Sequence, residues 1–115
     1  MMVCAALAAL HAVAAQAQGE RFPSKPLRIV TAEVGGGNDY SSRVIAAGLS
    51  AALGQQVVVE NRGGAGGAIA AEIVARAPAD GYTLLLYGSP IWLAPYLRSH
   101  VSYDPVRDFA PITLT

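Results

Sequence analysis

Three glycine-containing loops carry the residues whose types and spacing could do chemistry in this sequence. They span Gly35–Asp39, Asn61–Gly67 and Gly88–Pro90. Each follows an apolar stretch and precedes a stretch with helical periodicity, so we expect each loop to lead from a strand into a helix. Glycine leaves backbone N–H groups open to close approach, and a helix dipole places roughly half a positive charge at its N-terminus. The loops therefore predict a site for a phosphate, a sulfate or a carboxylate.

Glycine-rich loops also occur in nucleotide-binding enzymes, and that alternative stays open. Gly64-Ala65-Gly66 resembles the start of a dinucleotide-binding fingerprint, but Ile69 stands where a third glycine is expected. The acidic residue expected about 20 residues later is also missing. No Gly-Lys-Ser/Thr sequence follows any glycine run, which excludes a P-loop. A further alternative is that these glycines only form tight turns.

Catalytic chemistry finds little support in the sequence. His11 and His100 lack a plausible set of nucleophile, base and orienting group, and no Gly-x-Ser-x-Gly motif surrounds Ser89. No cluster of His, Asp or Glu has the spacing of metal ligands. We therefore expect a protein that is not an enzyme and that needs no cofactor or metal. Ser89 is expected to donate a hydrogen bond to a ligand or to form part of a turn.

Alternating strands and helices must position these loops. Apolar runs predict strands over residues 27–31, 56–60 and 82–87, and helical spacing predicts helices up to residue 53, over 68–76 and over 91–97. Asn38 or Asp39 is the expected N-cap of the first helix, and Gly54 is placed to end it. Continuous apolar strands favour a parallel sheet covered on both faces. The fold class is thus α/β, a three-layer α/β/α domain with a mainly parallel sheet.

Hydrophobic spacing also predicts which side chains face the sheet. Trp92 and Tyr96 could wall a cleft beside the third loop, but their spacing favours packing in the core. The other residues expected to point inward are Val44, Ile45, Leu49, Ala52 and Leu53 in the first helix and Ile69, Ile73 and Val74 in the second.

The first 17 residues are predicted to be a signal peptide. The stretch is apolar, is interrupted only by His11, and ends in Ala15-Gln16-Ala17, a small-x-small cleavage site. It is shorter than the ~20 residues of a membrane-spanning helix. No Lys or Arg opens it, which suggests a start codon further upstream; an apolar helix of the mature fold is the alternative. We expect export to the periplasm, with residues 18–115 forming the domain.

Charge and cysteine content exclude other classes of protein. The chain of 115 residues has 8 basic and 8 acidic side chains and no basic run, so a nucleic-acid partner is not expected. Its one cysteine, Cys4, lies in the apolar leader, so it cannot form an internal disulfide or a cysteine-based metal site.

Several segments together resemble one known family. The chain is similar to the receptors of tripartite tricarboxylate transporters, also called Bug-type proteins, in both the order and the spacing of these segments. They are Phe22–Val30, Gly35–Asp39, Leu53–Arg62, Gly64–Gly67, Ala79–Leu85 and Tyr103–Pro111. The resemblance covers essentially all of residues 22–115.

The resemblance implies a monomeric periplasmic binding protein, type II-like, with two α/β domains around a cleft. Such receptors capture a small organic acid, commonly a carboxylate, and pass it to membrane permease subunits. A receptor domain that reports to a membrane sensor kinase is an alternative. Carried over by position, the residues expected at the ligand are Gly36, Gly37, Asn38, Asp39, Asn61, Arg62, Gly88 and Ser89.

Some of these residues have a structural role as an alternative. A carboxylate repels a carboxylate, so Asp39 is better suited to cap its helix, and Arg62 has the competing role of tying loops together by hydrogen bonds. At Gly36 we expect bulk to block the approach of the anion and to strain a positive φ.

The chain also departs from the family. Many relatives have a proline-aromatic pair before the first glycine loop, where this chain has Thr31-Ala32-Glu33-Val34. Glu33 adds a negative charge, which would favour an amine-bearing or neutral ligand. Family members are considerably longer, so we expect the second domain, and with it half of the site, to be absent from residues 18–115.

Overall fold

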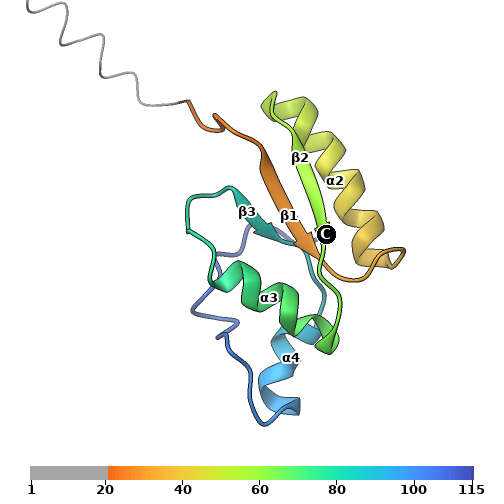
Figure 1. Cartoon of the computed structure of the whole chain (residues 1–115), viewed down its shortest axis with the longest axis vertical. Helices are drawn as coiled ribbons and strands as arrows, with labels where there is room; N and C mark the ends of the chain where they lie inside the picture. Colours follow the sequence, from red (N-terminus) through yellow and green to blue (C-terminus); the bar gives the residue numbers. More distant parts are fainter. Residues whose placement is uncertain (1–20) are drawn as a thin grey trace, which may run out of the picture.

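A three-stranded parallel sheet forms the centre of the fold (Figure 1). The computed structural model describes residues 21–115, so the predicted signal peptide lies outside the described residues. The strands are β1 (Leu27–Thr31), β2 (Val57–Asn61) and β3 (Thr83–Leu85), in the order β2-β1-β3. In the central strand, Ile29 pairs with Val59 on one side and with Leu84 on the other. The predicted parallel sheet is confirmed, although β3 is shorter than expected.

Helices cover both faces of this sheet, and a helix follows each strand. They are α2 (Gly37–Leu53), α3 (Ala68–Ala75) and α4 (Pro90–Leu97), with a 3-10 turn, η2 (Ala65–Gly67), directly before α3. Figure 1 shows α2 on one side of the sheet and α3 with α4 on the other. The three-layer α/β/α class predicted from the sequence is therefore confirmed.

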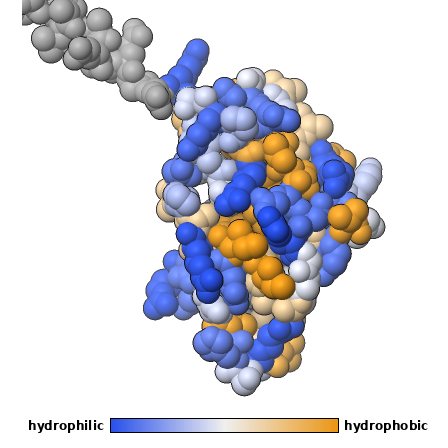
Figure 2. All heavy atoms as spheres, viewed as in Figure 1, coloured by the Kyte–Doolittle hydropathy of each residue, from blue (hydrophilic) through white to orange (hydrophobic). Residues whose placement is uncertain are grey.

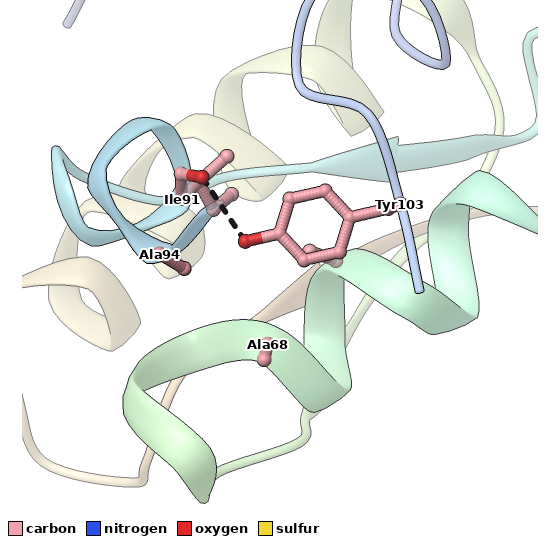
Figure 3. Packing of buried hydrophobic residues seen from close by; sticks show 5 residues of the cluster. Ala68, Ile91, Ala94 and Tyr103 are labelled. Carbon is pink, nitrogen blue, oxygen red and sulfur yellow. Dashed lines mark hydrogen bonds between the residues drawn. The ribbon is translucent and has the colours of Figure 1, made fainter. Parts of the chain in front are cut away.

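Two hydrophobic clusters hold the layers together. The first joins α2 to the sheet through Leu27, Ile29, Ala46 and Val57. The second lies between α3, α4 and the C-terminal segment and contains Ala68, Ala71, Ile91, Ala94 and Tyr103. Figure 3 shows the Tyr103 hydroxyl pointing at α4, where it donates a hydrogen bond to the carbonyl oxygen of Ile91 at 3.0 Å. This bond satisfies the one polar atom that the ring carries into the core.

The buried face of α2 differs from the predicted one. Val44 is 55% exposed and Leu53 is also exposed, whereas Asp39, Ser42 and Ala46 are buried. These three residues recur at intervals of three and four, so they form a single helical stripe. The prediction is right for Ile45 and Leu49, which are half-buried against the first cluster, and wrong for Val44 and Leu53.

The predicted packing of Ile69, Trp92 and Tyr96 is wrong for a similar reason. Ile69 and Trp92 are about half exposed and Tyr96 is 86% exposed. Small residues take the inward positions of α3, and only Ile91 and Ala94 are buried in α4.

Figure 2 shows hydrophobic residues in the middle of the visible face, between hydrophilic ones. No helix within residues 21–115 has the length and hydropathy needed to cross a membrane.

Candidate functional site

Three loops leave the sheet at the same edge because the strands are parallel (Figure 1). Hydrogen bonds hold the three strand ends in register. The Arg62 N–H donates to the Thr31 carbonyl oxygen at 2.9 Å, and the Thr31 hydroxyl donates to the Leu86 carbonyl oxygen at 2.9 Å. The structure thus brings together the loops that the sequence singled out.

The first loop ends in an accessible helix start. The N-cap of α2 is Gly36, so the predicted cap at Asn38 or Asp39 is wrong: both residues lie in the first turn. Backbone N–H groups of a first turn have no carbonyl group a turn earlier to accept their hydrogen bonds. Gly36 and Gly37 are exposed and Asn38 is half-buried, so an anion can approach this turn from solvent. No side chain caps the turn.

Asp39 points into the protein and binds neighbouring groups. Its side chain is 6% exposed, and its Oδ2 accepts a hydrogen bond from the Gly35 N–H at 2.9 Å. The Asn61 side-chain amide donates to Oδ1 at 2.9 Å, and Arg43 forms an ion pair with the same oxygen at 3.0 Å. These contacts, first the Gly35 bond and then those of Asn61 and Arg43, lower the pKa of Asp39 to about 2. The carboxylate is therefore ionised, and its charge is balanced by its own neighbours.

Asn61 connects this network to the end of β2. Its amide nitrogen also donates to the Ala32 carbonyl oxygen at 2.9 Å, and its Oδ1 accepts from Arg43 at 3.1 Å. Every polar atom of the side chain is thus used within the protein. We call Asp39, Asn61 and Arg43 the loop-anchoring triad, because they fix the first loop to the second strand. Sequence reasoning missed Arg43, although its position four residues after Asp39 on a helix was a usable signal.

Arg62 forms an ion pair rather than reaching the first loop. Its guanidinium contacts Glu60 at 2.6 Å, and Glu60 also accepts from Arg28 at 3.2 Å. The Arg62 side chain is thus bound to a residue of β2, the strand that it follows, and its backbone N–H reaches the end of β1. Ligand contact by this side chain stays a prediction.

Glu33 reaches across to the second loop. Its Oε1 accepts a hydrogen bond from the Gly64 N–H at 2.9 Å, and this bond lowers the pKa of Glu33. One backbone donor of this loop is thus already bound by a carboxylate, whose charge would repel a phosphate. This contact counts against the dinucleotide-binding alternative.

The third loop brings a tyrosine and a serine to the same edge. The Tyr87 ring lies against Gly67 so closely that a Cβ at Gly67 would come within 2.1 Å of it. Burial, followed by the charge of Glu33, raises the pKa of Tyr87. Gly88 is half-buried, and Ser89 is the exposed N-cap of α4, where its hydroxyl makes no capping bond. The sequence placed Tyr87 in a strand and did not predict its contact with the second loop.

Two hollows on the described surface lie away from the glycine loops. One of about 350 Å³ is lined by Tyr96, Tyr103 and Val106, and one of about 450 Å³ by Lys25, Arg28 and Tyr82 among others. The second lies where the strands begin, at the edge opposite the glycine loops. Within residues 21–115, no group of three or more His, Cys, Asp or Glu side chains is arranged to hold a metal ion.

Comparison with solved structures defines the class of protein. The chain is similar to the periplasmic binding protein BugD, with a TM-score of 0.76 and 41% identity, over 79% of this chain and 31% of that one. It is also similar to Rpa4515 of R. palustris, solved with adipate, with a TM-score of 0.70 and 39% identity, over 74% of this chain and 29% of that one. The described fold is therefore an α/β domain of the periplasmic binding protein class.

The family follows from the sequence comparison. Residues 41–115 match the profile described as "Tripartite tricarboxylate transporter family receptor". The chain is 39% identical to BugT of Bordetella pertussis over 105 residues, which cover 89% of this chain and 32% of BugT. The chain belongs to the tripartite tricarboxylate transporter receptor family, a family of binding receptors and not of enzymes. It spans about a third of the length of the curated relatives it matches.

Proposed function

We propose that this protein captures a small organic acid in the periplasm as part of a receptor and delivers it to the permease subunits of a tripartite tricarboxylate transporter. The observation that carries this proposal is the exposed start of α2, held in place by the loop-anchoring triad. Rigid backbone donors at a helix start favour an anion without any reorganisation of the protein. Adipate in the R. palustris relative is an organic acid of the expected kind.

The negative charge of Asp39 does not oppose this role. Its carboxylate is buried and is bound by the Gly35 N–H, Asn61 and Arg43, so little of its charge acts on an approaching carboxylate. The donors offered to the ligand are instead the backbone groups of Gly37 and Asn38. We therefore expect truncation of the Asn38 side chain to weaken binding only modestly.

A bulky residue at Gly36 tests the proposal. Gly36 has φ −84° and ψ 172°, an extended conformation that valine adopts, so the strain expected there from a positive φ is absent. A Cβ at Gly36 would meet only the Glu33 carbonyl oxygen, at 3.7 Å. Gly36→Val should therefore leave the fold intact while its branched side chain covers the anion's approach.

The measurement requires both sides of the ligand cleft. We define the joined receptor as residues 21–115 continued by the remaining part of Rpa4515. Calorimetric titration with di- and tricarboxylates, amino acids and aromatic acids should identify a binder, and Gly36→Val should abolish its binding. Gly48→Val is the matched control, because Gly48 lies on the same helix and a Cβ added there would have no atom within 4 Å. Normal binding by Gly36→Val would show that the first loop is only a turn.

A further inference from the structure

An exposed carboxylate, that of Glu33, is hydrogen-bonded to the second loop at the edge where the three loops leave the sheet. Glu33 follows β1, and its carboxylate accepts the Gly64 N–H of the second loop at 2.9 Å. The same side chain lies over Gly63, where a Cβ would come within 2.6 Å of the Glu33 Cγ. On the side of the third loop, the charge of Glu33 acts on the Tyr87 hydroxyl. One acidic side chain next to the first loop therefore contacts the second loop and acts electrostatically on Tyr87, the residue before the third.

Within residues 21–115 the charge of Glu33 is not neutralised by an ion pair. Arg43 and Arg62 pair with other carboxylates. Arg98 lies beside the second loop, within 3.3 Å of the position of a Cβ at Gly66, but forms no ion pair with Glu33. Because the hydrogen bond from Gly64 lowers the pKa of Glu33, its side chain carries a full charge at neutral pH.

We infer that Glu33 determines the specificity of the receptor by selecting a ligand with a carboxylate at one end and an ammonium group at the other. This inference rests on the proposed function. The ligand carboxylate binds the start of α2. A second carboxylate cannot take the Gly64 N–H, which is already bound by an anion, and it would be repelled by Glu33. An ammonium group at the same place is attracted and donates hydrogen bonds to the Glu33 carboxylate.

Glu33→Gln separates this role from a purely structural one. Glutamine keeps a side-chain oxygen that can accept the Gly64 N–H, so the loop contact survives while the charge is lost. A residue that only satisfies the backbone would tolerate this change without altering ligand preference. Glu72→Gln is the matched control, since Glu72 lies on α3, pairs with Arg76 and loses the same charge.

The experiment compares acids of equal chain length on the joined receptor. Dissociation constants are measured for two pairs, succinate with 4-aminobutyrate and adipate with 6-aminohexanoate. Butanoate and hexanoate are the references, because the end opposite their carboxylate is uncharged. In Glu33→Gln, the dissociation constant of each dicarboxylate, divided by that of the amino acid of equal length, should fall by about tenfold. The reason is that the attraction of Glu33 for the ammonium group and its repulsion of the second carboxylate, both partly screened by solvent, are removed together. Glu72→Gln should leave the ratio unchanged.

The possible outcomes are distinguishable. An unchanged ratio in Glu33→Gln, with the acids still binding, overturns the inference and leaves the proposed function standing. Binding of none of the six acids by the unaltered receptor overturns the inference, and the proposed function is overturned with it only if the tricarboxylates and aromatic acids also fail to bind. If Glu33→Gln does not fold, the unaltered receptor decides: equal or tighter binding of the dicarboxylates overturns the inference, and tighter binding of the amino acids supports it.

Discussion

At the scale of single residues, Asp39 organises the edge of the sheet that we assign to the ligand. Its carboxylate accepts hydrogen bonds from the Gly35 N–H and the Asn61 side-chain amide and forms an ion pair with Arg43. Local sequence suggested a helix cap at this residue, but one of its partners, Asn61, lies 22 residues away. The loop-anchoring triad could not be predicted from the neighbourhood of Asp39 alone.

The pH dependence of stability should report on Asp39. Its pKa in the folded protein, about 2, is below that of an unfolded aspartate, so its contribution is fully present above the unfolded value and is lost as pH falls through the folded one. We expect the urea midpoint of the chain to drop between about pH 4 and pH 2. Asp39→Asn should lower the midpoint at pH 7 and flatten that drop. Asp80→Asn, at an exposed aspartate, is the control, and an equal slope in Asp39→Asn would argue against the network.

At the scale of elements, the two ends of α2 depend on glycine for different reasons. Gly36 opens the helix without a side chain, whereas Gly54 closes it in the left-handed conformation, with φ 65° and ψ 20°. The N–H of Gly54 donates to the Ser50 carbonyl oxygen at 3.1 Å. The end at Gly54 was predictable, because glycine is the usual residue where a left-handed conformation closes a helix.

Alanine substitutions at two glycines of this helix region should have opposite effects. Gly54→Ala should reduce the free energy of unfolding by about 1 kcal/mol, because an L-residue is disfavoured at this positive φ. Gly48→Ala, in the helix interior and in open space, should raise it by roughly 0.5–1 kcal/mol. Urea denaturation of both variants provides the comparison. A stabilised Gly54→Ala would mean that α2 does not end at this residue.

At the scale of the whole molecule, the sequence predicted the sheet and the meeting of the loops because both follow from local patterns. Apolar runs near Leu27, Val57 and Thr83 separated by helical stretches specify parallel strands, and parallel strands bring their following loops to one edge. The contacts across that edge were not predictable, since Glu33 and Gly64 lie 31 residues apart. Nor was the exposure of Tyr96, because hydrophobic spacing on a short helix does not say which side is covered.

The central claim is that backbone N–H groups at the start of α2 bind a carboxylate, and selective labelling tests it most directly. In the joined receptor, ¹⁵N-glycine labels the 11 glycines within residues 21–115 together with those of the added part, and each reports on its own amide. Titration of the joined receptor with the acid found by calorimetry should change the amide chemical shifts of Gly36 and Gly37 most. These changes should saturate at the same acid concentration as the heat of binding. Heat that saturates while these two amides stay unmoved, and while Gly81 near the opposite edge of the sheet shifts instead, would contradict this claim.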